Sequence, residues 1–449
     1  MRNSIAIIAL FVAGLFVART FAQAPAGTMK DPNTGNTFKI DPNHPELPTD
    51  WIDPDTGHRV VRLTREDGSA SLYFHQNAYT PDGKKVIFKS PTGLYTVDLA
   101  TRQIEQVLAE PDISVVVAGR KNFDVYYMSD TTSKDVVNGP PRSVYVVDLK
   151  TRKSRKIAEL PKGANVTTVN CDETLLCGSI TYPRPGEAEL PEFRYSANGR
   201  IDTGYRRGLH LPMELMTINI ATGEKKFFNR STEWLNHIQF SPTDPHMLMF
   251  CHEGPWQAVD RIWYIDVTGG EPHMVHDRTM RNEIAGHEFW SADGKAIWYD
   301  LQTPISQVFW IAGKNLETGM RTWYPIKKSE WSVHFNISPD GSLFAGDGGG
   351  PGSVARGDNG QWIYLFTPQG GGARGARAGR GGAAPDTERD QSNLIVPGRL
   401  VAEKLVNLAK HDYALEPNVS FTPDMKWIVF RSNMLGPTHV YAVEIAKGN

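Results

Sequence analysis

The chain has 449 residues, of which 40% are hydrophobic and 22% are charged, and its formal net charge is −2. This composition is typical of an ordinary folded protein and excludes a disordered or fibrous chain. The near-neutral charge provides no global basic field, which argues against a dedicated nucleic-acid binder. Only three cysteines are present, so no disulfide framework is expected. For Cys171 and Cys177 both a bridge and two free buried thiols stay open.

The first residues form a pattern typical of secreted proteins. A basic start at Arg2 precedes an apolar run from Ile5 to Val17, and small residues follow up to Ala24. The run is short for a membrane span, and no later stretch of about 18 apolar residues exists. The pattern predicts a signal peptide over residues 1–24 and a periplasmic or extracellular mature protein, with an uncleaved anchor as the alternative.

A unit of short apolar strands recurs along the chain. Each copy has an apolar strand, a turn of the Ser/Thr-Pro-Asp-Gly type, a second strand, and a third strand that ends near Asp-x-x-Thr-Gly. Asp-Gly between alternating apolar runs is a hairpin signal. The seven copies are marked by Pro81, Asn122, Asn170, Pro242, Ala292, Pro339 and Pro423. Repeats of about 40 to 50 residues predict propeller blades, so we expect an all-β, seven-bladed β-propeller in a single domain.

The repeats also predict the boundaries of the domain. The propeller is expected over residues 59–449, after an N-terminal arm over residues 25–58. The strand at residues 59–64 is predicted to pair with the C-terminal strand and so remove an open sheet edge. Two insertions interrupt the repeats. Residues 184–211 are polar and aromatic, whereas residues 370–390 are Gly/Arg-rich and predict a flexible loop, more a solvated linker than a polyanion-binding segment.

Histidines occupy matching places in several repeats. The innermost strand of each propeller blade lines the central channel, so the same position can be compared from blade to blade. Counting back six or seven residues from each turn aspartate gives His75, His237, His287, His334 and Asn418. The chain has 13 histidines, and chance would place fewer than one of them there. The pattern predicts a funnel lined by histidines, although a lone histidine is as often packed or solvated.

These side chains suit a metal site. Imidazoles with carboxylate or amide oxygens favour a borderline divalent ion such as Mn²⁺, Zn²⁺ or Ni²⁺. An imidazole left uncoordinated would serve as a base near neutral pH. Glu416 and Asn418 are two residues apart and therefore face the same side of an extended strand. A surface carboxylate is the alternative reading for Glu416.

Segments of the fourth and fifth repeats resemble a known enzyme family. They are His237, Cys251-His252-Glu253-Gly254-Pro255-Trp256, Val259-Asp260-Arg261 and His287-Glu288-Phe289-Trp290. At this spacing they resemble the oligogalacturonate lyases of polysaccharide lyase family 22, over residues 55–445 and most strongly over residues 230–300. The resemblance implies a seven-bladed propeller that splits short pectic oligomers by β-elimination, aided by Mn²⁺. It also implies that His237 is the base and His287 a metal ligand.

The chain departs from the family pattern at its metal ligands. Where the family has Gln-x-x-His-x-His before the last turn, this chain has Tyr413, Glu416 and Asn418. A site built from these residues would offer a metal more oxygen and less nitrogen.

A second departure concerns the catalytic arginine. The resemblance places that arginine at Glu214, and a carboxylate cannot neutralise a uronate. Arg206 and Arg207 in the preceding insertion are the candidate replacements, with two surface arginines as the alternative.

The sequence therefore predicts a secreted lyase that acts on a uronate-containing oligosaccharide. The expected site comprises His237 and Arg207 as catalytic residues, His75, Arg206, His252, Trp256 and Arg261 as substrate-binding residues, and His287, His334, Glu416 and Asn418 as ligands of a divalent metal, expected to be Mn²⁺. We expect no nucleic-acid partner, no membrane association after signal cleavage, and a monomer or dimer. The alternative function is a noncatalytic periplasmic propeller that binds a glycan or a protein.

Overall fold

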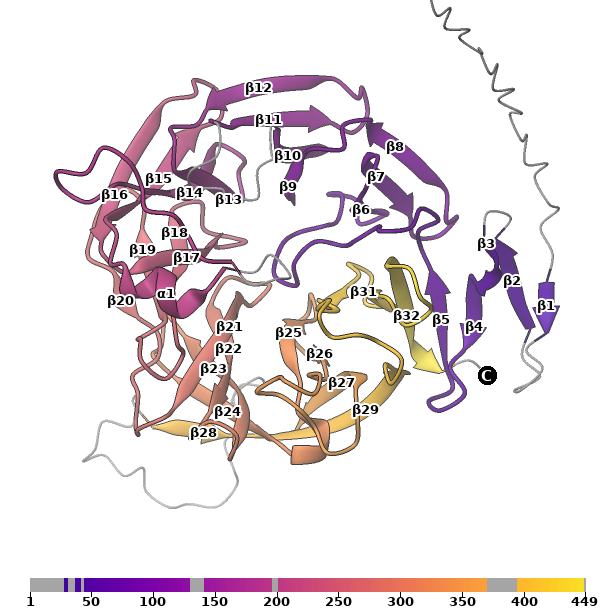
Figure 1. The fold of residues 1–449 in the computed structure, drawn as a ribbon. Helices are drawn as coiled ribbons and strands as arrows, with labels where there is room; N and C mark the ends of the chain where they lie inside the picture. The colour runs from indigo at the N-terminus through magenta and orange to yellow at the C-terminus, as the bar shows by residue number, and fades with distance from the viewer. Residues whose placement is uncertain are drawn as a thin grey trace, which may run out of the picture.

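A computed structural model describes residues 28–30, 37–41, 44–129, 141–195, 201–369 and 394–447. The predicted signal peptide and the Gly/Arg-rich segment lie outside these residues. Figure 1 shows the sheets arranged as blades in a ring around a central axis. The predicted seven-bladed β-propeller is thereby confirmed.

The first four blades follow one another along the chain. Blade 1 contains β6 (Lys85–Ser90), β7 (Gly93–Asp98) and β8 (Ile104–Leu108). Blade 2 contains β9 (Ser114–Ala118), β10 (Asp124–Ser129), β11 (Ser143–Asp148) and β12 (Ser154–Glu159). Blade 3 contains β13 (Ala164–Val169), β14 (Leu175–Thr181), β15 (Met213–Asn219) and β16 (Lys225–Ser231). Blade 4 contains β17 (Trp234–Phe240), β18 (Met247–Glu253), β19 (Ile262–Asp266) and β20 (His273–Met274).

The last three blades include strands that come from distant parts of the chain. Blade 5 contains β21 (Ile284–Trp290), β22 (Ala296–Gln302), β23 (Phe309–Asn315), β24 (Arg321–Ile326) and the parallel strand β28 (Ile395–Pro397). Blade 6 contains β25 (Val333–Ile337), β26 (Phe344–Asp347), β27 (Trp362–Gln369) and β29 (Arg399–Asn407). Blade 7 contains β30 (Ser420–Phe421), β31 (Trp427–Ser432), β32 (His439–Lys447), β5 (His58–Arg62) and β4 (Asp50–Ile52).

The N-terminal strands close the ring. As the sequence predicts, β5 pairs with β32 in antiparallel register, with Val61 opposite Ala442. This pairing covers the edge that β32 would otherwise expose. Within the expected arm, β4 extends the same sheet, while β1 (Thr28–Lys30), β2 (Thr37–Asp41) and β3 (His44–Pro48) form a separate sheet beside blade 7 (Figure 1).

The turns between inner strands follow the predicted chemistry. The hydroxyl groups of Thr80 and Ser338 each donate a 2.7 Å hydrogen bond to the aspartate two residues later. That aspartate in turn accepts the backbone N–H of the second residue after it. Gly83 and Gly341 then adopt positive φ angles of 69° and 72°, which glycine tolerates without strain. The repeated motif therefore fixes where each inner strand ends.

Apolar side chains fill the space between neighbouring blades. Val86 of β6, Val125 of β10 and Val429 of β31 lie in one buried cluster that joins blades 1, 2 and 7. Fully burying such a side chain contributes about 1.5–3 kcal/mol. Because each blade packs against both neighbours, the innermost strands are held rigidly around the axis.

Helix contributes little to the fold. Among the described residues the only α-helix is α1 (Thr203–Gly208), whose preceding residue Asp202 accepts a hydrogen bond from the Tyr205 N–H. No helix in that part of the chain is long and apolar enough to cross a membrane. The cysteines are all free, so Cys171 and Cys177 form no bridge.

Candidate functional site

The residues predicted at the funnel share an unusual backbone conformation. His237, His287, His334 and Asn418 have φ angles of 46°, 48°, 48° and 55°. This left-handed region costs roughly 1–2 kcal/mol for a residue other than glycine. In blades 4 to 6 the histidine lies where the pairing of the two inner strands shifts register, which defines a β-bulge. Bulges re-aim side chains, and strain repeated at matched positions indicates a functional constraint.

The fourth predicted histidine, His75, reaches the axis by another route. It belongs to the segment between β5 and β6, which extends into the middle of the ring (Figure 1). Its ring lies 6.1 Å from that of His237. Burial and the neighbouring His237 lower the pKa of His75 to about 3, so this imidazole is neutral. His75 therefore offers the funnel a hydrogen-bonding group but no positive charge.

Tyr73 is a funnel residue that sequence reasoning missed. Its ring centroid lies 5.0 Å from that of His75, 5.9 Å from that of His237 and 5.7 Å from that of His334. Burial, and then the negative charge of Glu416, raise the pKa of the Tyr73 phenol well above its usual value. The ring of Tyr73 thus lies among three histidines, and its phenol stays neutral.

His237 lies between two carboxylates. Its Nδ1 atom is 3.3 Å from Glu288 Oε1, which belongs to the neighbouring blade, and its Nε2 atom is 3.5 Å from Glu253 Oε2. Arg261 forms a 2.6 Å ion pair with the other oxygen of Glu253. Burial opposes protonation of His237, but the charges of Glu288 and Glu253 outweigh it and raise the pKa of the imidazole. The site therefore stabilises a protonated His237.

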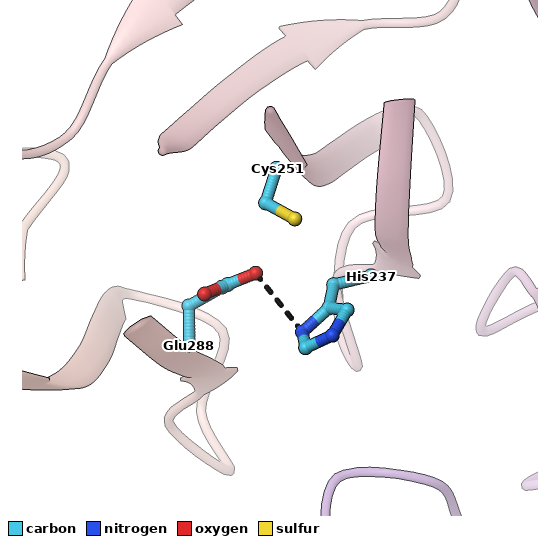
Figure 2. A group of neighbouring side chains, drawn as sticks. All are labelled: His237, Cys251 and Glu288. Carbon is cyan, nitrogen blue, oxygen red and sulfur yellow. Dashed lines mark ion pairs between the residues drawn. The ribbon is translucent and has the colours of Figure 1, made fainter. Parts of the chain in front are cut away.

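Cys251 completes a compact group with His237 and Glu288. Figure 2 shows the three side chains facing one another, and their ligand atoms lie within 4.8 Å. A bound metal would require the thiolate form of the cysteine. However, burial and the charge of Glu288 raise the pKa of Cys251 well above its usual value, and Arg261 Nη2 lies 3.7 Å from the sulfur. A protonated thiol beside a guanidinium group is a poor site for a divalent cation.

His287 and His334 form a second group with different partners. His287 Nδ1 lies 3.0 Å from Asp300 Oδ2, and His334 Nδ1 lies 3.1 Å from both oxygens of Asp347. The two rings are 4.5 Å apart. A histidine whose Nδ1 atom is held by a carboxylate is the usual arrangement of a metal ligand.

The remaining nitrogen of His334 is available to a ligand. Its Nε2 atom lies 3.7 Å from Glu416 Oε2 and, within the described residues, is buried without a hydrogen-bond partner. Burial opposes protonation of His334, but the charge of Asp347 raises the pKa of its imidazole. Two imidazoles and a carboxylate are a donor set that Mn²⁺ or Zn²⁺ accepts. The residues predicted to hold a metal at this place therefore fit a divalent ion, although they are less compact than the group around Cys251.

Asp300 and Asp347 were absent from the sequence-based prediction. Each lies on the second strand of its blade, opposite the residue that precedes the histidine: Gly286 pairs with Asp300 and Val333 with Asp347. The signal was an aspartate 13 residues after the histidine in two successive repeats.

A cavity of about 430 Å³ opens beside the second group. Its lining includes Trp256, His287, His334 and Glu416, together with residues 350–354 and 412–414. The Trp256 ring meets His287 edge-on at 4.9 Å. Gly286 allows this approach, because a Cβ atom there would lie 3.2 Å from the indole. The structure thus places Trp256 at the funnel, as predicted for a substrate-binding residue.

The two candidate arginines of the insertion have different positions. Arg206 is buried against the rings of Phe193 and Trp234, and burial lowers its pKa to about 10. Arg207 instead lies across Gly254, since a Cβ atom on that glycine would be 2.3 Å from Arg207 Cδ. Among the described residues, Arg207 Nε is buried without a hydrogen-bond partner. The structure brings Arg207 toward the Glu253 end of the funnel and packs Arg206 between blades 3 and 4.

Two other predicted substrate-binding residues are not brought to the cavity. Arg261 is buried and engaged with Glu253, and its side chain is only 1% exposed. His252 lies on the opposite face of β18 from Cys251, because side chains alternate along a strand. Its ring centroid lies 5.2 Å from that of Trp263. Burial lowers the pKa of His252.

Comparison with known proteins finds relatives that cover most of the chain. A family model described as oligogalacturonate lyase matches residues 202–365. The chain is 25% identical over 417 residues to the oligogalacturonate lyase of Dickeya dadantii, covering 88% of this chain and 95% of that one. It is also 25% identical over 423 residues to the oligogalacturonide lyase of Pectobacterium atrosepticum, again covering 88% and 95%.

Solved structures agree in fold. An oligogalacturonate lyase in complex with manganese and the oligogalacturonate lyase of Vibrio parahaemolyticus each superpose with a TM-score of 0.68 at 22% identity. Each comparison covers 94% of this chain and 99% of the other. The match to the family model coincides with the blades that carry His237, His287 and His334. The chain is therefore a seven-bladed β-propeller that is similar to oligogalacturonate lyases over most of its length.

Proposed function

We propose that the protein is a lyase that cleaves uronate-containing, pectic oligosaccharides by β-elimination with the help of a divalent ion. The proposed ion is Mn²⁺. The relatives that cover the chain are named for this activity, and one solved relative is described with manganese. The observation that carries the proposal is the difference between the funnel histidines. His237 lies 3.3 Å and 3.5 Å from two glutamates, whereas Nδ1 of His287 and of His334 is held at 3.0–3.1 Å by an aspartate of the same blade. Glu416, itself a proposed ligand, lies 3.7 Å from Nε2 of His334.

His237 is the proposed base. Removing the weakly acidic C5 proton of a uronate produces an imidazolium ion, so the site must stabilise that ion. Glu288 at 3.3 Å and Glu253 at 3.5 Å provide this stabilisation. A raised pKa also makes the neutral imidazole a stronger base.

His287, His334 and Glu416 are the proposed metal ligands. Asp300 and Asp347 hold the Nδ1 atoms of the two histidines, which directs both Nε2 atoms away from those carboxylates. A bound divalent ion would stabilise the negative charge that develops on the uronate carboxylate during proton removal.

Arg207 is the proposed cation for the same carboxylate. Arg261 cannot serve, because Glu253 already neutralises it at 2.6 Å. Arg207 lies beside Glu253 across Gly254, and its buried Nε lacks a partner within the described part of the chain. An anionic substrate would satisfy this donor.

The elimination also requires a proton for the departing oxygen. The C5 proton passes to His237, the C4–O bond breaks as the C4–C5 double bond forms, and the leaving oxygen takes a proton. Tyr73 carries a hydroxyl group on a ring whose centroid lies 5.9 Å from that of His237 and 5.7 Å from that of His334. We assign it this role, with water restoring its proton afterwards.

The test is direct. The purified protein is incubated with Mn²⁺ and digalacturonate or trigalacturonate, and the ultraviolet absorbance of the unsaturated uronate is followed. We expect the absorbance to rise and the rise to stop when the metal is chelated. His237→Ala should show no rise although it still binds the metal. The proposal would be refuted if the protein bound no metal and produced no absorbance change with any uronic oligomer. Oligomer binding without cleavage would instead favour the noncatalytic propeller.

The proposed function also includes secretion. The basic start and apolar run of residues 1–24 support export to the periplasm or beyond. N-terminal sequencing of the protein recovered from the periplasm should find a chain that begins close to residue 25. A full-length chain retained in the cytoplasm would contradict export.

A further inference from the structure

We infer that Tyr413 and Asn418 are positioning residues that act through the buried Asp347 to hold His334 in its metal-binding orientation. This inference rests on the proposed function, because it assumes that His334 is a metal ligand. It concerns the residues that fix His334 rather than the ligands themselves.

Asp347 gathers donors from two blades. The side chain is fully buried at the end of β26 and lies 3.1 Å from His334 Nδ1 through each oxygen. The Tyr413 hydroxyl donates to Oδ1, and the backbone N–H of Asn418 donates to Oδ2 at 2.9 Å. One carboxylate of blade 6 is therefore bound by the segment that carries Glu416.

This arrangement fixes the tautomer of His334. An ionised Asp347 only accepts hydrogen bonds, so Nδ1 of His334 carries the proton and Nε2 keeps its lone pair. Nε2 lies 3.7 Å from Glu416 Oε2. The same carboxylate thus orients one proposed ligand and anchors the chain on either side of the other.

Asn418 is used for positioning and not for ligation. Its side-chain Nδ2 donates to the Glu416 carbonyl at 3.1 Å, and its Oδ1 accepts the Phe74 N–H at 3.3 Å. The left-handed φ of 55° aims its own N–H at Asp347. Because both ends of the amide are engaged with backbone, we assign Asn418 to positioning rather than to the expected ligation of the metal.

Tyr413 is placed by the glycine-rich loop after β26. A Cβ atom on Gly350 would lie 2.4 Å from Tyr413 Cβ, so only glycine allows the phenol to pack there. Both residues line the cavity that contains His334 and Glu416. The hydroxyl of Tyr413 therefore reaches Asp347 from the cavity side.

Blade 5 provides a comparison within the same chain. Asp300 contacts His287 through Oδ2, whereas its Oδ1 is buried without a hydrogen-bond partner among the described residues. The extra donors of Asp347 are thus a property of blade 6 and do not follow from the blade repeat.

The test measures Mn²⁺ binding by the full-length protein, using the electron paramagnetic resonance signal of free Mn²⁺. Partners of metal-binding histidines typically contribute 10- to 100-fold in affinity, so we expect Tyr413→Phe to weaken binding by about 10-fold. Glycine tolerates the left-handed backbone at residue 418. Asn418→Gly should therefore also weaken Mn²⁺ binding, because it removes the side-chain hydrogen bond to the Glu416 carbonyl. Tyr364→Phe is the matched control, because its hydroxyl donates to the Ser329 carbonyl in the same blade at 2.9 Å. It should leave Mn²⁺ affinity unchanged, and melting of the metal-free variants reports any loss of folding.

The outcomes separate this inference from the proposed function. If His334→Ala loses Mn²⁺ but Tyr413→Phe binds as tightly as the wild type, the positioning role is overturned and the metal site stands. If Tyr413→Phe and Tyr364→Phe weaken binding equally, the effect is structural and the positioning role is again overturned. If His287→Ala and His334→Ala both bind like the wild type, or the wild type binds no Mn²⁺, the proposed metal site and this inference fail together.

Discussion

Replacing Glu288 with glutamine tests the proposal that His237 acts as the base. Glu288 is fully buried, and its Oε1 atom lies 3.3 Å from His237 Nδ1. At an effective dielectric constant of about 20, two unit charges at this separation attract by about 5 kcal/mol. Glu253 at 3.5 Å is already paired with Arg261 and compensates only in part. Glu288→Gln should therefore lower the pKa of His237 substantially.

The sign of the effect on activity follows from the role of the base. Only neutral His237 accepts the C5 proton, so wild-type kcat/KM should rise with pH through a pKa above the ordinary value for histidine. In Glu288→Gln this rise should move to lower pH, and the plateau should fall because the imidazole is a weaker base. The assay is a series of initial rates from absorbance over a range of pH at saturating Mn²⁺.

A matched control separates this effect from loss of a buried carboxylate. Glu283 is also buried and pairs with His276 away from the funnel. Glu283→Gln should lower thermal stability while leaving the pH at which activity rises unchanged. A Glu288→Gln profile that coincides with the wild type, or moves to higher pH, would refute the charge-pair argument.

The remaining predictions concern the other proposed groups. His287→Ala should weaken Mn²⁺ binding by about 100-fold or more in a metal titration, since a ligand contributes at least as much as its outer partner. Arg207→Ala should lower kcat/KM by about 10²- to 10³-fold, the usual effect of removing a charge-stabilising donor, whereas Arg207→Lys should recover part of it, and unchanged kinetics would exclude this arginine. Tyr73→Phe should lower kcat by about 10²-fold or more, as expected for loss of a general acid, with Mn²⁺ affinity retained; a change in KM alone would assign Tyr73 to binding.

The fold was predictable because the repeated turn motif is local. The hydroxyl of Thr80 or Ser338, the aspartate and the following glycine make their contacts within five residues, so the sequence alone reports them. The spacing of residues relative to this turn motif also identified the positions of His237, His287 and His334. Their side chains reach the axis because the blades are nearly equivalent.

The partners of these histidines were not predictable in the same way. Asp300 meets His287 across two strands, and Glu288 meets His237 across two blades, so both contacts depend on register and on packing between sheets. Arg206 and Arg207 are neighbours on α1, where successive side chains point about 100° apart. The sequence could name the pair but not decide which one faces the funnel, since the insertion is not part of the repeat.

The proposed division between base and metal ligand rests on one position on the second strand of each blade. The residue that pairs opposite the neighbour preceding each funnel histidine is Cys251 in blade 4, Asp300 in blade 5 and Asp347 in blade 6. An aspartate there holds Nδ1 and leaves Nε2 for a metal. Blade 4 has the thiol of Cys251 in place of this aspartate, and His237 has Glu288 and Glu253 as its carboxylate partners instead. Glu288 and Glu253 favour a proton on His237, and the Arg261 guanidinium group beside Cys251 disfavours a metal ion there, which suits the proposed base.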